Sequence, residues 1–144
     1  MHPIDIREAV IEDAEGIAPL IVELGYRITI DDLKSQMRTY SVGGDSVLVA
    51  VDAEEIIGFL SLHFIPFMHA TGGLCRITAM SVSSRYRMKG VGRSLLNKAE
   101  SVASSLGGKR LEVTSGDHRK EDAHIFYQSC GFRLSDRRFL KDLT

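Results

Sequence analysis

Residues 80–93 read Met-Ser-Val-Ser-Ser-Arg-Tyr-Arg-Met-Lys-Gly-Val-Gly-Arg, and the other predicted elements are arranged around this stretch. A strand-like run ends at Val82, and a segment with helical periodicity, 94–106, follows the glycines at 90 and 92. The first N–H groups of a helix have no partner inside it, so they can bind an anion. Glycine leaves room for that anion because it has no Cβ. The stretch therefore predicts a phosphate-binding turn.

The charges around the turn agree with this interpretation. Residues 56–99 contain no Asp or Glu, whereas the whole chain has a net charge of −1. Such a basic stretch favours docking of a polyanion. The alternative is an ordinary turn with a solvated basic face, because a lone G-x-G is weak evidence for phosphate binding. The stretch lacks both the P-loop pattern and the third glycine of a dinucleotide fold.

Length and composition predict one soluble globular domain over residues 1–144, with 44% hydrophobic and 26% charged residues. No apolar run approaches the roughly 20 residues that span a membrane, and the first residues lack a signal-peptide pattern. A pI near 6.5 gives no reason to expect nucleic acid as a partner. Cys75 and Cys130 form no C-x-x-C pair, so we expect reduced thiols in a cytoplasmic protein.

The periodicity along the chain predicts alternating strands and helices. Strands are expected at 4–7, 47–51, 56–64, 74–82 and 110–114, with a last strand or hairpin at 132–140. Helices are expected at 12–24 with Pro19 inside, at 29–40 capped by Asp31 or Asp32, at 91–106, and at 122–130 capped by Asp122. Hairpins come first and βαβ crossovers later. This order predicts a mixed α/β fold whose sheet has helices on both faces.

Two motifs resemble the GNAT superfamily of N-acetyltransferases. One is Arg87-x-x-Gly90-x-Gly92 between a strand and a helix, and the other is the run 123–132, Ala-His-Ile-Phe-Tyr-Gln-Ser-Cys-Gly-Phe, which is similar to A-x-x-F-Y-x-x-x-G-F. They occur in the order that the family shows. The resemblance implies a mixed, mostly antiparallel sheet that splays between strands 74–82 and 110–114.

The resemblance also implies the cofactor and its site. Acetyl-CoA would be the co-substrate, and no metal is implied. Main-chain groups of Met80 and Val82 would pair with the pantetheine arm. The residues of the R-x-x-G-x-G turn would bind the pyrophosphate, mainly through their amides: Arg87, Met88, Lys89, Gly90, Val91, Gly92 and Arg93.

The tyrosine of the second motif is Tyr127, and the resemblance implies that it protonates the leaving thiolate. From the residues alone, a place in the helix core beside Ala123 and Phe126 is favoured for this side chain. His124 lies three residues earlier, and its role stays open.

The general base is unassigned. Thr78 and Ala79 stand where many members carry an acidic residue, and neither can accept a proton from an ammonium. The remaining candidates qualify by chemical type only: His63, Glu112, Asp117 and His118.

We therefore expect an N-acetyltransferase that moves an acetyl group from acetyl-CoA to an amine by direct attack. The alternative is a non-catalytic acyl-CoA-binding or sensing module of the same fold. The sequence does not identify the acceptor amine, and it leaves open whether the protein is a homodimer.

Overall fold

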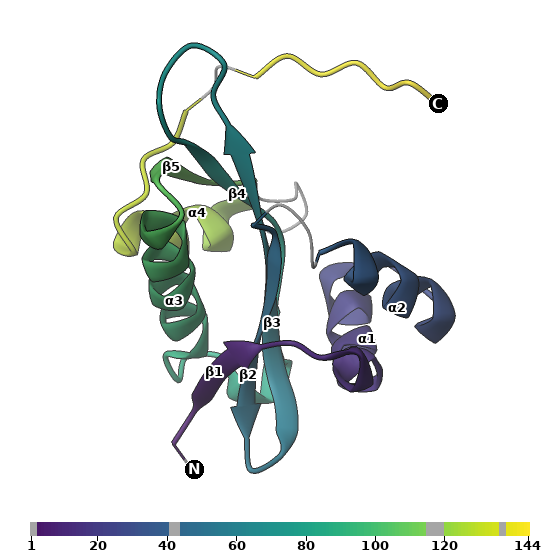
Figure 1. Ribbon diagram of the computed structural model, residues 1–144. Helices are drawn as coiled ribbons and strands as arrows, with labels where there is room; N and C mark the ends of the chain where they lie inside the picture. The colour runs from purple at the N-terminus through teal and green to yellow at the C-terminus, as the bar shows by residue number, and fades with distance from the viewer. Residues whose placement is uncertain (1–2, 41–43, 115–119, 136–137) are drawn as a thin grey trace. The chain divides into compact units, whose positions relative to one another are not determined.

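The computed structural model describes residues 3–40, 44–114, 120–135 and 138–144. The chain divides into two compact units, Met1–Thr114 and Ser115–Thr144. The first unit holds a five-stranded sheet in the order β1-β2-β3-β4-β5 (Figure 1). The strands are β1 (Asp5–Glu8), β2 (Ser46–Asp52), β3 (Glu55–Pro66), β4 (Gly73–Val82) and β5 (Gly108–Val113). All neighbours are antiparallel except β4 and β5, which are parallel. This confirms the predicted mixed, mostly antiparallel sheet.

Strands β2 and β3 form the hairpin that the sequence predicts. The turn is two residues long, because Asp52 pairs with Glu55. Ala53 and Glu54 both have positive φ, 46° and 72°, as a type I′ turn requires, and this turn matches the twist of the strands. The continuous apolar run of β2 follows from its place inside the sheet, where Val49 and Ala50 are both fully buried.

Helices cover both faces of the sheet (Figure 1). The 3₁₀ turn η1 (Ile11–Asp13), α1 (Ala14–Leu24) and α2 (Ile30–Thr39) lie on one face, and α3 (Val91–Ser105) lies on the other. On the first face the helices bury one cluster with the strands: Ala14, Ile17, Leu20, Leu33, Val49 and Phe59. On the second face α3 comes close to β3 at Gly58, where an added Cβ would lie 3.1 Å from Leu95.

The ends of the first two helices differ from the prediction. Helix α1 begins at Ala14 after η1, and Pro19 lies inside it. Helix α2 is capped by Thr29, whose hydroxyl accepts a hydrogen bond from the Asp32 amide at 3.1 Å. The prediction that Asp31 or Asp32 caps this helix is therefore wrong. A Thr with extended backbone in front of the helix satisfies an N–H that an Asp inside the first turn cannot reach.

A β-bulge explains why the sheet opens. Leu62 pairs with Ile77 and Ser61 pairs with Ala79, so Thr78 is an extra residue in β4. Pairing between β4 and β5 runs only as far as Ile77 and Val113. A bulge bends its strand and increases the local twist. The sheet therefore parts where the bulge begins, and residues 79–82 pair with β3 but not with β5.

The second unit contains α4 (Lys120–Ser129), which is followed by Gly131 at a φ of 94°. Asp122 lies inside this helix, so the prediction that it is the cap is wrong. A last strand was expected at 132–140, but the described residues 132–135 and 138–140 form none. The pattern there alternates too weakly to specify a partner strand.

Candidate functional site

The open edge of β4 presents main-chain groups of two predicted site residues. The Ser83 amide donates to Ile57 of β3 at 2.8 Å, so the main chain of Ser83 points toward β3. Successive residues of a strand point their N–H and C=O groups in opposite directions. The main chain of Met80 and of Val82 therefore points the other way, toward the edge that β5 leaves unpaired.

The turn after β4 leads directly into α3. It contains the 3₁₀ turn η2 (Ser84–Tyr86), then Arg87 in extended conformation, Met88 at a φ of 63° and Gly90 at 82°. Gly90 is the N-cap of α3, and the first helical hydrogen bond is Ser94 N to Gly90 O at 3.0 Å. The amides of residues 91 and 92 precede that bond, so the helix itself offers them no acceptor.

The space above Gly90 is open. A Cβ built there would meet no atom within 4 Å. Val91 is buried and fixes the first turn of α3, whereas Met88, Lys89 and Arg93 are exposed. A positive helix end with room above it fits a phosphate group.

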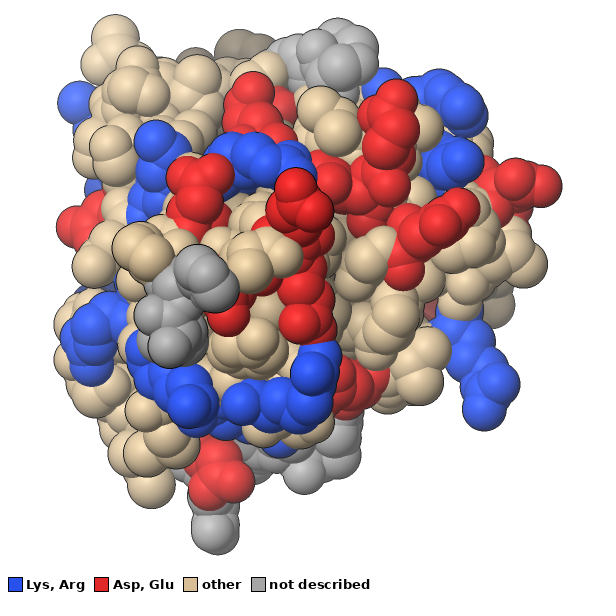
Figure 2. Space-filling model, turned by 90° about the horizontal axis from the view of Figure 1, so that it is seen from below, with Lys and Arg blue, Asp and Glu red and all other residues tan. Residues whose placement is uncertain are grey.

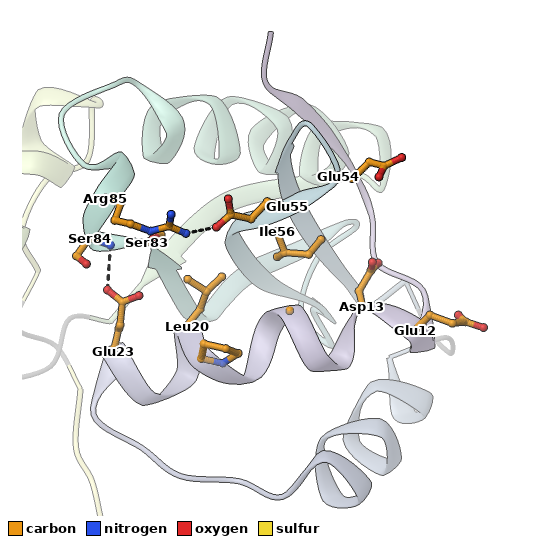
Figure 3. Close-up of a pocket in the computed structure, with 12 residues that line it drawn as sticks. Glu12, Asp13, Leu20, Glu23, Glu54, Glu55, Ile56, Ser83, Ser84 and Arg85 are labelled. Atoms are coloured by element: carbon orange, nitrogen blue, oxygen red, sulfur yellow. Dashed lines mark hydrogen bonds and ion pairs between the residues drawn. The ribbon is translucent and has the colours of Figure 1, made fainter. Parts of the chain in front are cut away.

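Acidic residues from other elements hold this turn in place (Figure 3). Glu23 of α1 accepts a hydrogen bond from the Ser84 amide at 2.9 Å and lies 3.8 Å from the Arg87 guanidinium. Glu55, at the start of β3, forms an ion pair with Arg85. Glu23 and Glu55 line a pocket beside the turn together with other carboxylates, those of Glu12, Asp13 and Glu54.

Asp52 provides a further anchor. Its carboxylate accepts a hydrogen bond from the Tyr86 phenol and raises the pKa of that hydroxyl. A raised pKa keeps Tyr86 protonated, so it remains a donor. The turn is thus fixed from α1 and from both strands of the β2–β3 hairpin.

These contacts partly neutralise the basic stretch 56–99, which contains no Asp or Glu. In sequence the stretch 56–99 looks purely basic, but three of its arginines, Arg76, Arg85 and Arg87, are paired with carboxylates from outside it. The view in Figure 2 shows acidic side chains gathered beside a curved row of Lys and Arg. The positive charge near the turn is therefore smaller than the sequence suggests, although exposed Lys89 and Arg93 also lie there.

A second polar cluster lies on the α1 and α2 face of the sheet, at the bulge. His63 Nε2 is 2.9 Å from the Tyr40 hydroxyl and 3.0 Å from the Thr78 hydroxyl. His63 Nδ1 is 3.4 Å from Asp45 Oδ2. The Thr78 hydroxyl also lies 2.8 Å from the hydroxyl of buried Ser61.

The other candidate bases have different surroundings. Glu112 on β5 faces Arg76 of β4 at 3.4 Å and is tied up in that cross-strand pair. Asp117 and His118 lie outside the described residues. Of the four candidates, the structure brings His63 next to Thr78, the position where the resemblance led us to look for an acid.

Tyr127 belongs to the second unit and is half-buried in an aromatic cluster. Its ring centroid lies 5.3 Å from that of Phe126 and 5.7 Å from that of Phe132. Its carbonyl accepts a hydrogen bond from the Phe132 amide at 3.0 Å. His124 lies on the same helix and is also half-buried. The strand-edge and turn residues are thus assembled in the first unit, and Tyr127 is fixed within the second.

Several residues that shape the site were not predicted. Asp45 and Tyr40 contact His63 from about twenty positions away, and Glu23 reaches the turn from 61 positions away. The one local signal was a pair of polar residues, Ser61 and His63, in an otherwise apolar strand. A polar side chain in such a strand needs a partner.

Other chemistries find little support among the described residues. No group of three or more His, Cys, Asp or Glu side chains is arranged to hold a metal in that part of the chain. Cys75 is fully buried in β4, and burial raises the pKa of its thiol, so it is not poised as a nucleophile. No helix in the described ranges is both long and apolar enough to cross a membrane.

The sheet opens between β4 and β5, and an open glycine turn leads into α3, as the resemblance to GNAT acetyltransferases implies. The family model for the Acetyltransferase (GNAT) family matches residues 20–132. The chain belongs to this family, and homologues support an acetyltransferase activity.

Known proteins agree with this assignment over nearly the whole chain. An aminoalkylphosphonate N-acetyltransferase of Salmonella typhimurium is 28% identical over 144 residues, covering 96% of this chain and 91% of its own. A GNAT family acetyltransferase structure from Staphylococcus aureus has a TM-score of 0.80 at 26% identity, covering 97% and 98% of the two chains. A putative acetyltransferase structure from Agrobacterium tumefaciens has a TM-score of 0.85 at 21% identity, covering 96% and 99%.

Proposed function

We propose that this protein is an N-acetyltransferase that uses acetyl-CoA as donor and a small amine as acceptor. The observation that carries the proposal is the continuity of β4, the turn and α3. One strand turns main-chain groups of Met80 and Val82 toward the edge where β5 no longer pairs with it, and it leads straight to the open helix end at Gly90. An extended arm that ends in a pyrophosphate would match both parts at once.

Each predicted cofactor residue has a role in this proposal. The main chain of Met80 and Val82 would pair with the amide groups of the pantetheine arm, as a neighbouring strand would. The amides from Met88 to Arg93 would bind the pyrophosphate. Lys89 and Arg93 would add positive charge, and Arg87 would mainly fix the turn through Glu23.

Chemistry at this site would depend on positioning and on proton transfer. Acetyl-CoA, when bound, supplies the acetyl group as a thioester. The strand edge would hold the thioester carbonyl near a main-chain N–H, which stabilises negative charge as it develops on the oxygen. The Tyr127 hydroxyl would donate its proton to the departing thiolate.

We further propose that residues 1–144 work as one acetyltransferase domain. The family match at 20–132 runs through both compact units, which supports this view. The described part of the chain has two free cysteines, one of them buried, which fits a reducing compartment such as the cytoplasm.

The similarity to a known acetyltransferase suggests which class of acceptor amine to test first. The Salmonella relative is named for aminoalkylphosphonates, so 2-aminoethylphosphonate is the first acceptor to test. A polyamine, an amino-acid derivative and a peptide N-terminus complete a panel of different amine classes.

The test is thiol release from acetyl-CoA with each amine, together with calorimetry using CoA. An amine-dependent release of thiol supports the proposal. Tight CoA binding without thiol release for any amine would instead favour the non-catalytic acyl-CoA-binding module. No CoA binding at all would remove both.

A further inference from the structure

We propose that His63 is the general base of the acetyl transfer, with Asp45 as its positioning residue and Thr78 as the neighbouring hydroxyl that marks where the amine binds. This inference rests on the proposed function, since it assigns the missing base of that same reaction. It is carried by a cluster that joins three separate parts of the first unit: the end of α2, the residue before β2, and the bulge between β3 and β4.

The two nitrogens of the His63 ring have different surroundings. Nδ1 lies 3.4 Å from Asp45 Oδ2, and the other oxygen of Asp45 accepts a hydrogen bond from the Phe64 amide at 3.1 Å. The carboxylate is therefore held in place by main chain. A carboxylate facing Nδ1 favours the proton on that nitrogen, and this leaves Nε2 as the acceptor.

Nε2 lies next to two hydroxyl groups. The Tyr40 hydroxyl at 2.9 Å can donate to it, and the Thr78 hydroxyl lies at 3.0 Å. The Tyr40 ring also packs against the imidazole, with centroids 4.8 Å apart. The ring of His63 is thereby fixed from three sides, as expected for a proton acceptor that must be oriented in advance.

The cluster around His63 is open to solvent next to the part of β4 that is proposed to hold the thioester arm. The His63 side chain is 27% exposed, and Thr78 is exposed. Thr78 is the first residue of β4 beyond the last pair with β5. Strand geometry puts Met80 only about 7 Å further along. An amine beside Thr78 would therefore lie between Nε2 and the main-chain groups proposed to hold the thioester arm.

The proposed step is a simple proton transfer. An acceptor arrives as an ammonium, R–NH₃⁺. The lone pair of Nε2 takes one proton, directly or through the Thr78 hydroxyl, and forms the imidazolium. The electrons of the broken N–H bond remain on the amine nitrogen as the lone pair that attacks the thioester carbon. The imidazolium then returns its proton to water.

The test uses two acceptors and one variant. His63→Gln keeps a polar side chain beside Tyr40 and Thr78 but removes the base. With 2-aminoethylphosphonate, or whichever primary amine the panel finds active, kcat/KM should fall about 10²–10⁴-fold. With the aminooxy analogue of that amine, which is already neutral at pH 7, the variant should react at nearly the wild-type rate. Added imidazole should restore part of the activity of His63→Ala.

His69→Gln is the matched control, because His69 is exposed on the hairpin loop between β3 and β4 and packs only beside Phe67 among the ring contacts of the described residues. This variant should keep wild-type activity. An equal loss with both acceptors in His63→Gln, accompanied by a lower Tm, would show that the cluster only fastens α2 to the sheet, and would overturn the inference.

Asp45 is tested by the tautomer that it is proposed to set. Nitrogen NMR of the imidazole should show the Nδ1–H form of His63 in the wild type and a mixture in Asp45→Asn. An unchanged tautomer in that variant would refute the positioning role. Wild-type protein that acetylates no amine would instead refute the proposed function, and the base assignment with it. Wild-type activity that His63→Gln leaves intact would refute the base alone.

Discussion

The two ends of α3 have nearly the same backbone and opposite surroundings. Gly90 before the helix and Gly107 after it have φ values of 82° and 84°, and a Cβ added to either would meet no atom within 4 Å. At the C-terminal end, carbonyls of the last helical turn accept hydrogen bonds from the amides of Leu106 and Gly107. The residue that follows, Gly108, is then tightly packed, with an added Cβ only 2.8 Å from the Ala103 carbonyl.

The N-terminal end stays open. Its first amides point away from the helix, and exposed Lys89 and Arg93 lie around them. A glycine in the left-handed conformation at a helix end therefore does not by itself indicate one function. At one end it closes a helix, and at the other it leaves amides and space for a ligand. The following predictions test whether that difference is functional.

The largest effect is expected from the proposed proton donor, Tyr127. Tyr127→Phe removes one hydroxyl and keeps the ring packed between Phe126 and Phe132. If Tyr127 protonates the thiolate, turnover should fall about 10²–10⁴-fold, while the Kd for CoA stays as in the wild type. Since a thiol ordinarily has a pKa of about 8.5, the loss should be greatest below neutral pH.

Melting temperature and a pH–rate profile on the same preparation provide the check on Tyr127. A stable variant with full activity at pH 6.5 would end its assignment as proton donor. A drop in Tm with normal turnover would mean that the hydroxyl serves only the aromatic cluster.

The direct comparison is Gly90→Ala against Gly107→Ala. Both place a Cβ at positive φ, so each should lose about 1–2 kcal/mol of stability. Only Gly90→Ala should disturb CoA binding. One charge-assisted hydrogen bond is worth about 1.5–3 kcal/mol, so its Kd should rise about 10- to 100-fold. Gly92→Val should weaken binding in the same way.

Calorimetry with CoA and thermal melts would decide this comparison. Equal CoA affinities in the two alanine variants would show that the ends of α3 do not differ in function, and would remove the phosphate-site assignment.

The anchor of the turn should have a smaller effect. Glu23→Ala removes the acceptor for the Ser84 amide and the partner of Arg87. A typical intramolecular hydrogen bond contributes about 0.5–1.5 kcal/mol, and this one is exposed, so CoA affinity should fall up to about tenfold. Glu15→Ala, at an exposed position of the same helix, is the control. Identical CoA affinities for the two variants would mean that Glu23 does not position the turn.

The smallest effect concerns charge. Lys89→Glu should weaken CoA binding about fivefold at low salt, because an exposed charge pair is worth about 1 kcal/mol in water. The effect should shrink above 0.1 M salt, where the screening length is about 10 Å. Lys98→Glu, further along α3 and also exposed, should change less. A Kd that is independent of salt would argue against any role for these cations.

Much of the fold could be predicted from the sequence. The hairpin, the strand–turn–helix unit at 74–106 and the two-sided sheet all follow from local periodicity and glycine placement. A strand was predicted at 132–140 but is absent from the described residues there, because a strand needs a partner and a sequence pattern does not name one. The predicted N-cap residues of α2 and α4 were wrong for a simpler reason, because several neighbouring polar residues can each occupy the one cap position.

The site was predictable only where it is continuous in sequence. The turn from Arg87 to Arg93 is such a stretch. The carboxylates that hold it and the partners of His63 come from residues up to 61 positions away. Their contacts depend on the tertiary fold, so residue type alone left His63 as one candidate among four.

The bulge at Thr78 has a consequence for how this protein could change over evolutionary time. Ile77 packs into the buried interior, and Ala79 packs against the α1 and α2 cluster. Thr78, the extra residue between them, is exposed and belongs to no regular pair of the ladder. Substitutions at Thr78 that keep a polar partner for the Ser61 hydroxyl should therefore cost the sheet little, because both packed faces are supplied by its neighbours. The protein can vary the chemistry beside His63 at this single position, and so explore new acceptors, without rebuilding the strand that carries the site.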